Sequence, residues 1–221
     1  MEPFHQCLAL GPVAIYFFLL GVINLSRRPV VVSGGRDAAA LGLAVSGLVF
    51  VGPMALLFPA SVAAHFGPWG TKYLWLMFVG LFACCLVFLL LTLRPRLVIY
   101  NISTGQLRPI LAELVERIDP EARWAGDCLC LPGLGVQLHL EGVGWMRNVS
   151  LVSAGPKQDY QGWSRLQAEI SAALRSVETP WNIAGLLLLC TGNILVIWLA
   201  WAIVHNPQAI AQTVLELLDM K

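Results

Sequence analysis

Residues 73–93 read YLWLMFVGLFACCLVFLLLTL and contain no Asp, Glu, Lys or Arg. Charged residues are also absent from three other long stretches, which are 3–26, 38–71 and 179–215. Each stretch can supply the roughly 20 apolar residues that a helix needs to cross a bilayer. Charged residues make up only 12% of the 221-residue chain, whereas soluble domains carry about 25%. The sequence therefore predicts an α-helical integral membrane protein with four transmembrane helices.

We expect the four transmembrane helices at 8–25, 38–60, 72–94 and 180–204. The first lacks the basic residues that precede the apolar core of a signal peptide, because Glu2 and His5 stand there, so we expect a retained helix. Asp37 is the expected N-cap of the second helix. Thr179 is the expected N-cap of the fourth, with Pro180 as its first residue.

The second predicted helix carries small residues at helical spacing, at Ala38, Gly42 and Ser46. Such a stripe allows a neighbouring helix to approach closely, and we expect it to pack inside this protein. A short amphipathic helix is expected at 207–219, after the last transmembrane helix. We expect it to lie in the outer membrane interface, and the alternative is that it docks a partner subunit.

Basic residues near the predicted helix ends are unevenly divided between the two sides of the membrane. One side has five, which are Arg27, Arg28, Arg36, Arg94 and Arg96. The other side has only Lys72 and Lys221. The positive-inside rule places the arginine-rich side in the cytoplasm. We therefore expect a multi-pass protein of a bacterial inner membrane, with both termini outside and residues 95–178 in the cytoplasm.

The segment 95–178 has the polarity of a soluble domain and a pattern of mixed secondary structure. Residue alternation and β-branched content predict four strands, at 96–101, 123–131, 135–141 and 147–153. Apolar residues at helical spacing predict two helices, at 107–118 and 163–177, with caps at Ser103 or Thr104 and at Asp159. We expect a small α+β domain of order β-α-β-β-β-α, inserted between the third and fourth transmembrane helices. It should form two layers, a mostly antiparallel sheet with two helices on one face.

Residues that could carry chemistry are scarce. No charged residue lies inside the apolar stretches, which disfavours ion-coupled transport. The chain has no G-x-S-x-G, H-E-x-x-H or P-loop motif, so we predict neither an enzyme nor a cofactor. The net charge of +1 argues against binding to nucleic acid.

Cysteine and histidine offer two possible metal sites. Cys128 and Cys130 lie two residues apart in a predicted strand and therefore on the same face. No second ligand pair accompanies them, so we expect core-facing thiols instead of a zinc site. His5, His65 and His205 all fall at helix ends on the predicted outer side, where they could bind copper or zinc if those ends met.

The favoured function is that of a non-enzymatic accessory, assembly or regulatory subunit of a membrane complex. Besides the lipid bilayer, we expect a protein partner or a homo-oligomer. The expected partner contact is Trp145, which should be exposed between two predicted strands, together with its neighbour Met146. Two alternatives remain open from the sequence. One is a small transporter or channel that acts as an oligomer, and the other is a membrane metalloprotein that uses the outer histidines.

Overall fold

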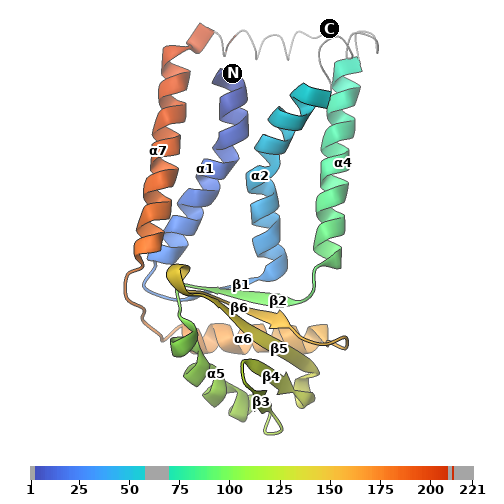
Figure 1. Ribbon diagram of the computed structural model, residues 1–221, viewed down its shortest axis with the longest axis vertical. Helices are drawn as coiled ribbons and strands as arrows, with labels where there is room; N and C mark the ends of the chain where they lie inside the picture. The colour runs from blue at the N-terminus through green and yellow to red at the C-terminus, as the bar shows by residue number, and fades with distance from the viewer. Residues whose placement is uncertain (1–2, 58–69, 209–210, 212–221) are drawn as a thin grey trace. The chain divides into compact units, whose positions relative to one another are not determined.

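The computed structural model describes residues 3–57, 70–208 and 211 (Figure 1). The chain divides into two compact units, which we describe separately. The helical unit comprises Met1–Leu19, Ala39–Thr92 and Leu189–Lys221. The sheet unit comprises Leu20–Ala38 and Leu93–Leu188. The predicted helix at 207–219 falls largely outside the described residues, and so does His65.

Among the described residues, four helices are long and apolar enough to cross a membrane, as the sequence predicts. They are α1 (Pro3–Leu25), α2 (Gly34–Leu57), α4 (Gly70–Thr92) and α7 (Ile183–His205). α1 begins earlier than predicted, at a proline, which suits the first turn of a helix because its missing N–H has no partner there in any case. α2 also begins earlier, so Asp37 lies in its first turn and is not its N-cap.

The predicted start of α7 at Pro180 is wrong, because the helix begins three residues later. Asn182 is the residue that caps it: its Oδ1 accepts a hydrogen bond from Ala184 N at 3.0 Å, and its carbonyl accepts one from Gly185 N at 3.0 Å. Thr179 has other partners, since its N–H donates to the Arg27 carbonyl at 2.9 Å.

Small residues bring neighbouring helices together in the helical unit. A Cβ added at Gly42 on α2 would lie 2.5 Å from Leu86 Cδ1 of α4, so the leucine side chain would have to move; this part of the predicted small-residue stripe does pack inside the protein. Gly47 of α2 similarly lies against the Leu8 carbonyl of α1, and Gly192 of α7 lies against Phe18 of α1. Backbones can approach this closely only where no Cβ intervenes.

The sheet unit is built on one six-stranded antiparallel sheet of order β1-β2-β6-β5-β4-β3 (Figure 1). The strands are β1 (Val30–Ser33), β2 (Arg96–Tyr100), β3 (Arg123–Ala125), β4 (Cys128–Leu131), β5 (Val136–Val143) and β6 (Asn148–Ser153). The prediction of four strands was therefore too low. The segment 123–131 is divided by a turn at Gly126, whose φ of 64° suits glycine, and this turn makes β3 and β4 a hairpin.

The sixth strand, β1, comes from the connection between α1 and α2, outside the predicted domain. It pairs with β2 in antiparallel register, with Val31 opposite Ile99. Three consecutive valines, Val30 to Val32, suit an extended strand because β-branched side chains pack well on a pleated surface. The sheet is thus completed by a strand that lies about 65 residues from its neighbour in the sequence.

Helices α5 (Thr104–Ile118) and α6 (Tyr160–Leu174) cover one face of the sheet, as expected for a two-layer arrangement (Figure 1). Alternate strand residues and one stripe from each helix form a single apolar core. Its members with no more than 1% exposure include Ile99, Leu107, Leu111, Leu129, Leu131, Leu138, Leu151, Leu166 and Ile170.

Candidate functional site

The turn between β5 and β6 presents the residues that the sequence singles out for partner binding. It is a short 3-10 helix, Gly144–Met146, followed by Arg147 in the left-handed region with φ of 53°. Trp145 is 70% exposed, which is high for so large an apolar side chain. Met146 is half-buried. Of the two predicted contact residues, Trp145 is therefore the one whose side chain is largely exposed and accessible to a partner.

Hydrogen bonds to two other segments, 102–106 and 180–182, fix this turn. Asn182 Nδ2 donates to the Met146 carbonyl at 2.8 Å, and Ile102 N donates to the Arg147 carbonyl at 2.6 Å. The guanidinium of Arg147 donates to the Pro180 carbonyl and to Gln106 Oε1, both at 2.9 Å. An exposed indole on a backbone held in this way loses little conformational freedom when it binds a partner.

A cavity of about 380 Å³ lies beside Trp145 within the sheet unit. It is lined by Gly144, Trp145, Arg147, Trp181, Asn182, Ile183, Ala184 and Leu187. Trp181 is 67% exposed, and the Arg27 guanidinium lies 5.8 Å from the centre of its ring, within the range of a cation–π contact. The sequence places Trp181 at a membrane interface but gives no sign that it adjoins Trp145.

A buried asparagine lies at the end of β2 and ties the strand to two distant segments. Asn101 is fully buried in the left-handed conformation, with φ of 61°. Its Nδ2 donates a hydrogen bond to the carbonyl of Ser26, which directly follows α1. The same Nδ2 donates to Thr179 Oγ1, in the segment that precedes α7, at 2.9 Å. We call Asn101, Ser26 and Thr179 the asparagine junction. It connects the sheet with the chain leaving α1 and the chain entering α7.

A second polar contact joins α2 to the sheet. Asp37, in the first turn of α2, accepts hydrogen bonds from Tyr100 Oη and from Arg96 Nη2, the latter at 3.2 Å. The side chain predicted to cap α2 therefore bonds to the first and last residues of β2 instead. Together with the asparagine junction, this contact joins the sheet to the ends of three of the four apolar helices.

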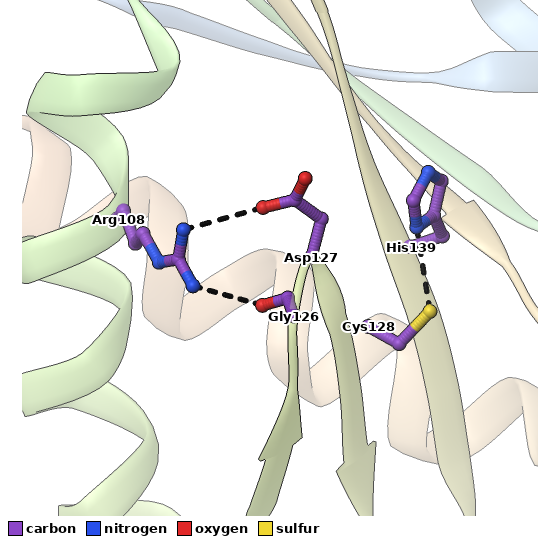
Figure 2. A network of polar contacts seen from close by, with 5 residues as sticks. All are labelled: Arg108, Gly126, Asp127, Cys128 and His139. Atoms are coloured by element: carbon purple, nitrogen blue, oxygen red, sulfur yellow. Dashed lines mark hydrogen bonds and ion pairs between the residues drawn. The ribbon is translucent and has the colours of Figure 1, made fainter.

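Figure 2 shows the polar network around the β3–β4 turn and strand β5. Arg108 of α5 pairs with Asp127 Oδ1 at 3.2 Å and donates to the Gly126 carbonyl at 2.8 Å. Cys128 Sγ lies 3.4 Å from Nδ1 of His139, which stands directly opposite it on β5. The arginine–aspartate pair holds the hairpin against α5.

The prediction of core-facing thiols at Cys128 and Cys130 is wrong. Cys128 is exposed and Cys130 is half-buried, because Leu129 and Leu131 occupy the core-facing positions of β4. Since alternate strand residues face opposite sides of a sheet, only one of the two pairs can face the core, and the leucines gain more from burial.

Of the three histidines of the predicted metal site, the described residues include two, His5 and His205. His5 lies on α1, and His205 is the last residue of α7, where its Nδ1 lies 3.0 Å from the Trp201 carbonyl. Within the part of the chain that the structure describes, no three His, Cys, Asp or Glu residues are grouped as metal ligands. Because His65 lies outside that part, the three-histidine site stays a prediction.

Comparison of the chain with protein-family models, with curated proteins and with solved structures finds no match. The described residues hold four helices that are long and apolar enough to span a membrane, and a unit built on a six-stranded antiparallel sheet.

Proposed function

We propose that the protein is a four-span membrane protein that acts as a non-enzymatic accessory, assembly or regulatory subunit of a membrane complex. Residues 95–178 would lie in the cytoplasm of a bacterial cell, with both termini outside. The long charge-free stretches within the four apolar helices and the concentration of arginine at one set of helix ends support this arrangement.

The exposed Trp145 on its fixed turn is the observation that carries the proposal of a protein partner. Binding energy in protein interfaces is concentrated in a few residues, among which tryptophan is enriched, and these residues tend to lie beside well-formed pockets. Trp145 combines exposure with an adjoining cavity. Met146 would contribute mainly through its carbonyl, which accepts the Asn182 hydrogen bond and positions the turn.

The connections of this turn support a regulatory role. Asn182 bonds to the turn and also caps α7. The asparagine junction joins the same region of the sheet to the end of α1. A partner that displaced the turn would therefore act on the ends of two of the proposed transmembrane helices.

A photo-crosslinking amino acid at position 145, introduced into the full chain in its native membrane, tests the proposal. Tyr160 offers a matched control position, because it is an aromatic residue of the same unit and is 73% exposed. We expect a protein adduct from position 145 and none from position 160. Adducts of equal yield at both positions would count against a specific surface.

Substitution provides the second half of this test. Trp145→Ala should reduce co-purification of the crosslinked partner at least tenfold, because a central tryptophan contributes about 2 kcal/mol or more to an interface. Tyr160→Ala should leave it unchanged. An unaltered midpoint of thermal unfolding in both variants would show that the loss is one of binding. Full retention of the partner by Trp145→Ala would remove Trp145 from the proposal.

A further inference from the structure

The cavity beside Trp145 combines apolar walls with a positive charge. Trp145, Trp181, Ile183 and Leu187 give it broad apolar walls, while Arg147 places a guanidinium on its lining. Among the residues that the structure describes, no Asp or Glu lines the cavity. A ligand that satisfies this site therefore needs both an apolar part and a negative charge.

The positive charge at this cavity is not neutralised by the described part of the chain. Arg147 donates to a carbonyl and an amide oxygen, both of which are neutral. Arg27 is not itself a lining residue but lies over the ring of Trp181, which is one. It likewise has no carboxylate within ion-pair distance among the described residues. By contrast, Arg108 is paired with Asp127. An arginine remains charged at any physiological pH, so these two groups attract an anion.

The apolar wall continues along a helix that we propose enters the membrane. Ile183 and Leu187 are exposed and lie one turn apart at the start of α7, so their side chains share a face. Trp181 immediately precedes this helix, and indole rings favour the headgroup region of a bilayer. The basic and apolar parts of the cavity thus follow the order of a lipid, from headgroup to acyl chain.

We propose that this cavity binds an anionic glycerophospholipid. Its phosphate would lie against Arg27 and Arg147, and an acyl chain would lie along Ile183 and Leu187. This inference rests on the membrane placement proposed above, but not on the protein partner. We favour a lipid over an acidic peptide of a partner because the apolar wall is continuous with the α7 surface, where acyl chains are present without any assembly step.

Lipid retention by the purified full chain is the primary test. The chain is placed in nanodiscs of equal parts phosphatidylglycerol and phosphatidylcholine, extracted in mild detergent, and its bound phospholipid is measured by mass spectrometry. We expect the retained lipid to be enriched in phosphatidylglycerol. Arg27→Gln should reduce that enrichment about fivefold, as expected for one basic residue at a membrane surface.

Arg165→Gln serves as the matched control, because Arg165 is an exposed arginine on α6 with no ion-pair partner among the described residues. It removes the same charge from the same unit and should leave the enrichment unchanged. Arg147 is less suitable for this test, because its guanidinium also fixes the turn. Equal loss of enrichment in Arg27→Gln and Arg165→Gln would indicate attraction by overall charge and would overturn the proposed site.

Tryptophan fluorescence gives a second readout that does not depend on extraction. Phosphatidylglycerol with brominated acyl chains should quench the wild-type protein more than brominated phosphatidylcholine does. Trp181→Phe should remove most of this difference, whereas Trp163→Phe should preserve it, since Trp163 lies in the core of the sheet unit. Equal quenching by the two lipids would overturn the inference. A photo-crosslinking amino acid introduced at position 181 should form a lipid adduct, and a protein adduct in its place would also overturn the inference.

Alkaline washing of membranes separates failure of this inference from failure of the proposed function. If the wash releases the chain, the membrane placement is wrong, and the lipid site is overturned with it. If the chain stays in the membrane but shows no phosphatidylglycerol enrichment, only the lipid site is overturned.

Discussion

The sheet unit and the helical unit handle apolar side chains in opposite ways. In the sheet unit, leucine and isoleucine residues from four of the six strands, β2, β4, β5 and β6, and from helices α5 and α6 are enclosed in one core. In the helical unit, only 6% of the most apolar 18-residue stretch of α4 is buried by the rest of the chain. Burial away from water stabilises the first arrangement. The second is stable only if something other than water covers the helix, which is why we propose a bilayer around it.

The comparison is tested most strongly by replacing one leucine of each unit with alanine. Leu166 of α6 is 0% exposed and Leu91 of α4 is 79% exposed. Leu166→Ala should lower the free energy of unfolding by about 4 kcal/mol, because it leaves a cavity in a closed core. Leu91→Ala should lower it by less than about 0.5 kcal/mol. Thermal and denaturant unfolding of the purified full chain in detergent, followed by circular dichroism, would measure both.

The result for Leu91 also sharpens the comparison. A loss of stability as large as that of Leu166→Ala would mean that a second copy or a partner covers this face of α4 in the purified protein. The measured oligomeric mass of the variant would then fall. An unchanged mass together with a small loss fits a face that lipid or detergent covers.

The sequence predicts the elements whose signals are local. Four charge-free stretches indicate the four apolar helices. The caps of α5 and α6 follow from Ser103 and Asp159, and Asp159 does accept a hydrogen bond from Gln161 N at 3.0 Å. The exposure of Trp145 follows from its place in a glycine-bearing turn between strands.

The features that the sequence does not reveal depend on pairing between distant segments. The three valines of β1 are too few to be recognised as a strand, and they become one by pairing with β2. The cavity likewise forms because the segment that contains Trp181 lies beside the turn that carries Trp145, although the two are far apart in the sequence. A positive φ at Asn101 could have been suspected, since asparagine is among the few residues other than glycine that tolerate it, but its partners at Ser26 and Thr179 could not.

The asparagine junction gives the sheet unit a polar element that its apolar core lacks. Asn101→Ala should lower the free energy of unfolding by about 2.5 kcal/mol, because it removes hydrogen bonds to Ser26 and Thr179 and forces alanine into the left-handed region. Asn101→Gly removes the same hydrogen bonds but accepts this φ, so its loss should be about 1 kcal/mol smaller. Equal losses would indicate that hydrogen bonding alone accounts for the effect. Chemical denaturation of both variants in one detergent measures the difference.

The smallest expected changes in stability come from two glycine-to-alanine substitutions, and they should have opposite signs. A Cβ added at Gly185 of α7 would lie 2.8 Å from the Asn24 carbonyl carbon and 2.9 Å from Leu25 N. Because these are backbone atoms of α1, the two helix ends must separate, and Gly185→Ala should lower the free energy of unfolding by about 1 kcal/mol. A Cβ at Gly80 of α4 meets nothing within 4 Å in the described residues. Gly80→Ala should therefore raise stability by about 0.5 kcal/mol, since alanine is the better helix former. Thermal unfolding of the two variants side by side measures the sign of each change in stability.

If both substitutions raised stability, the close approach of α7 to α1 at this end would not be needed for the stability of the protein. If both lowered it, the open face of α4 would be in contact with another helix, and the contrast between the two units would be smaller than the structure indicates.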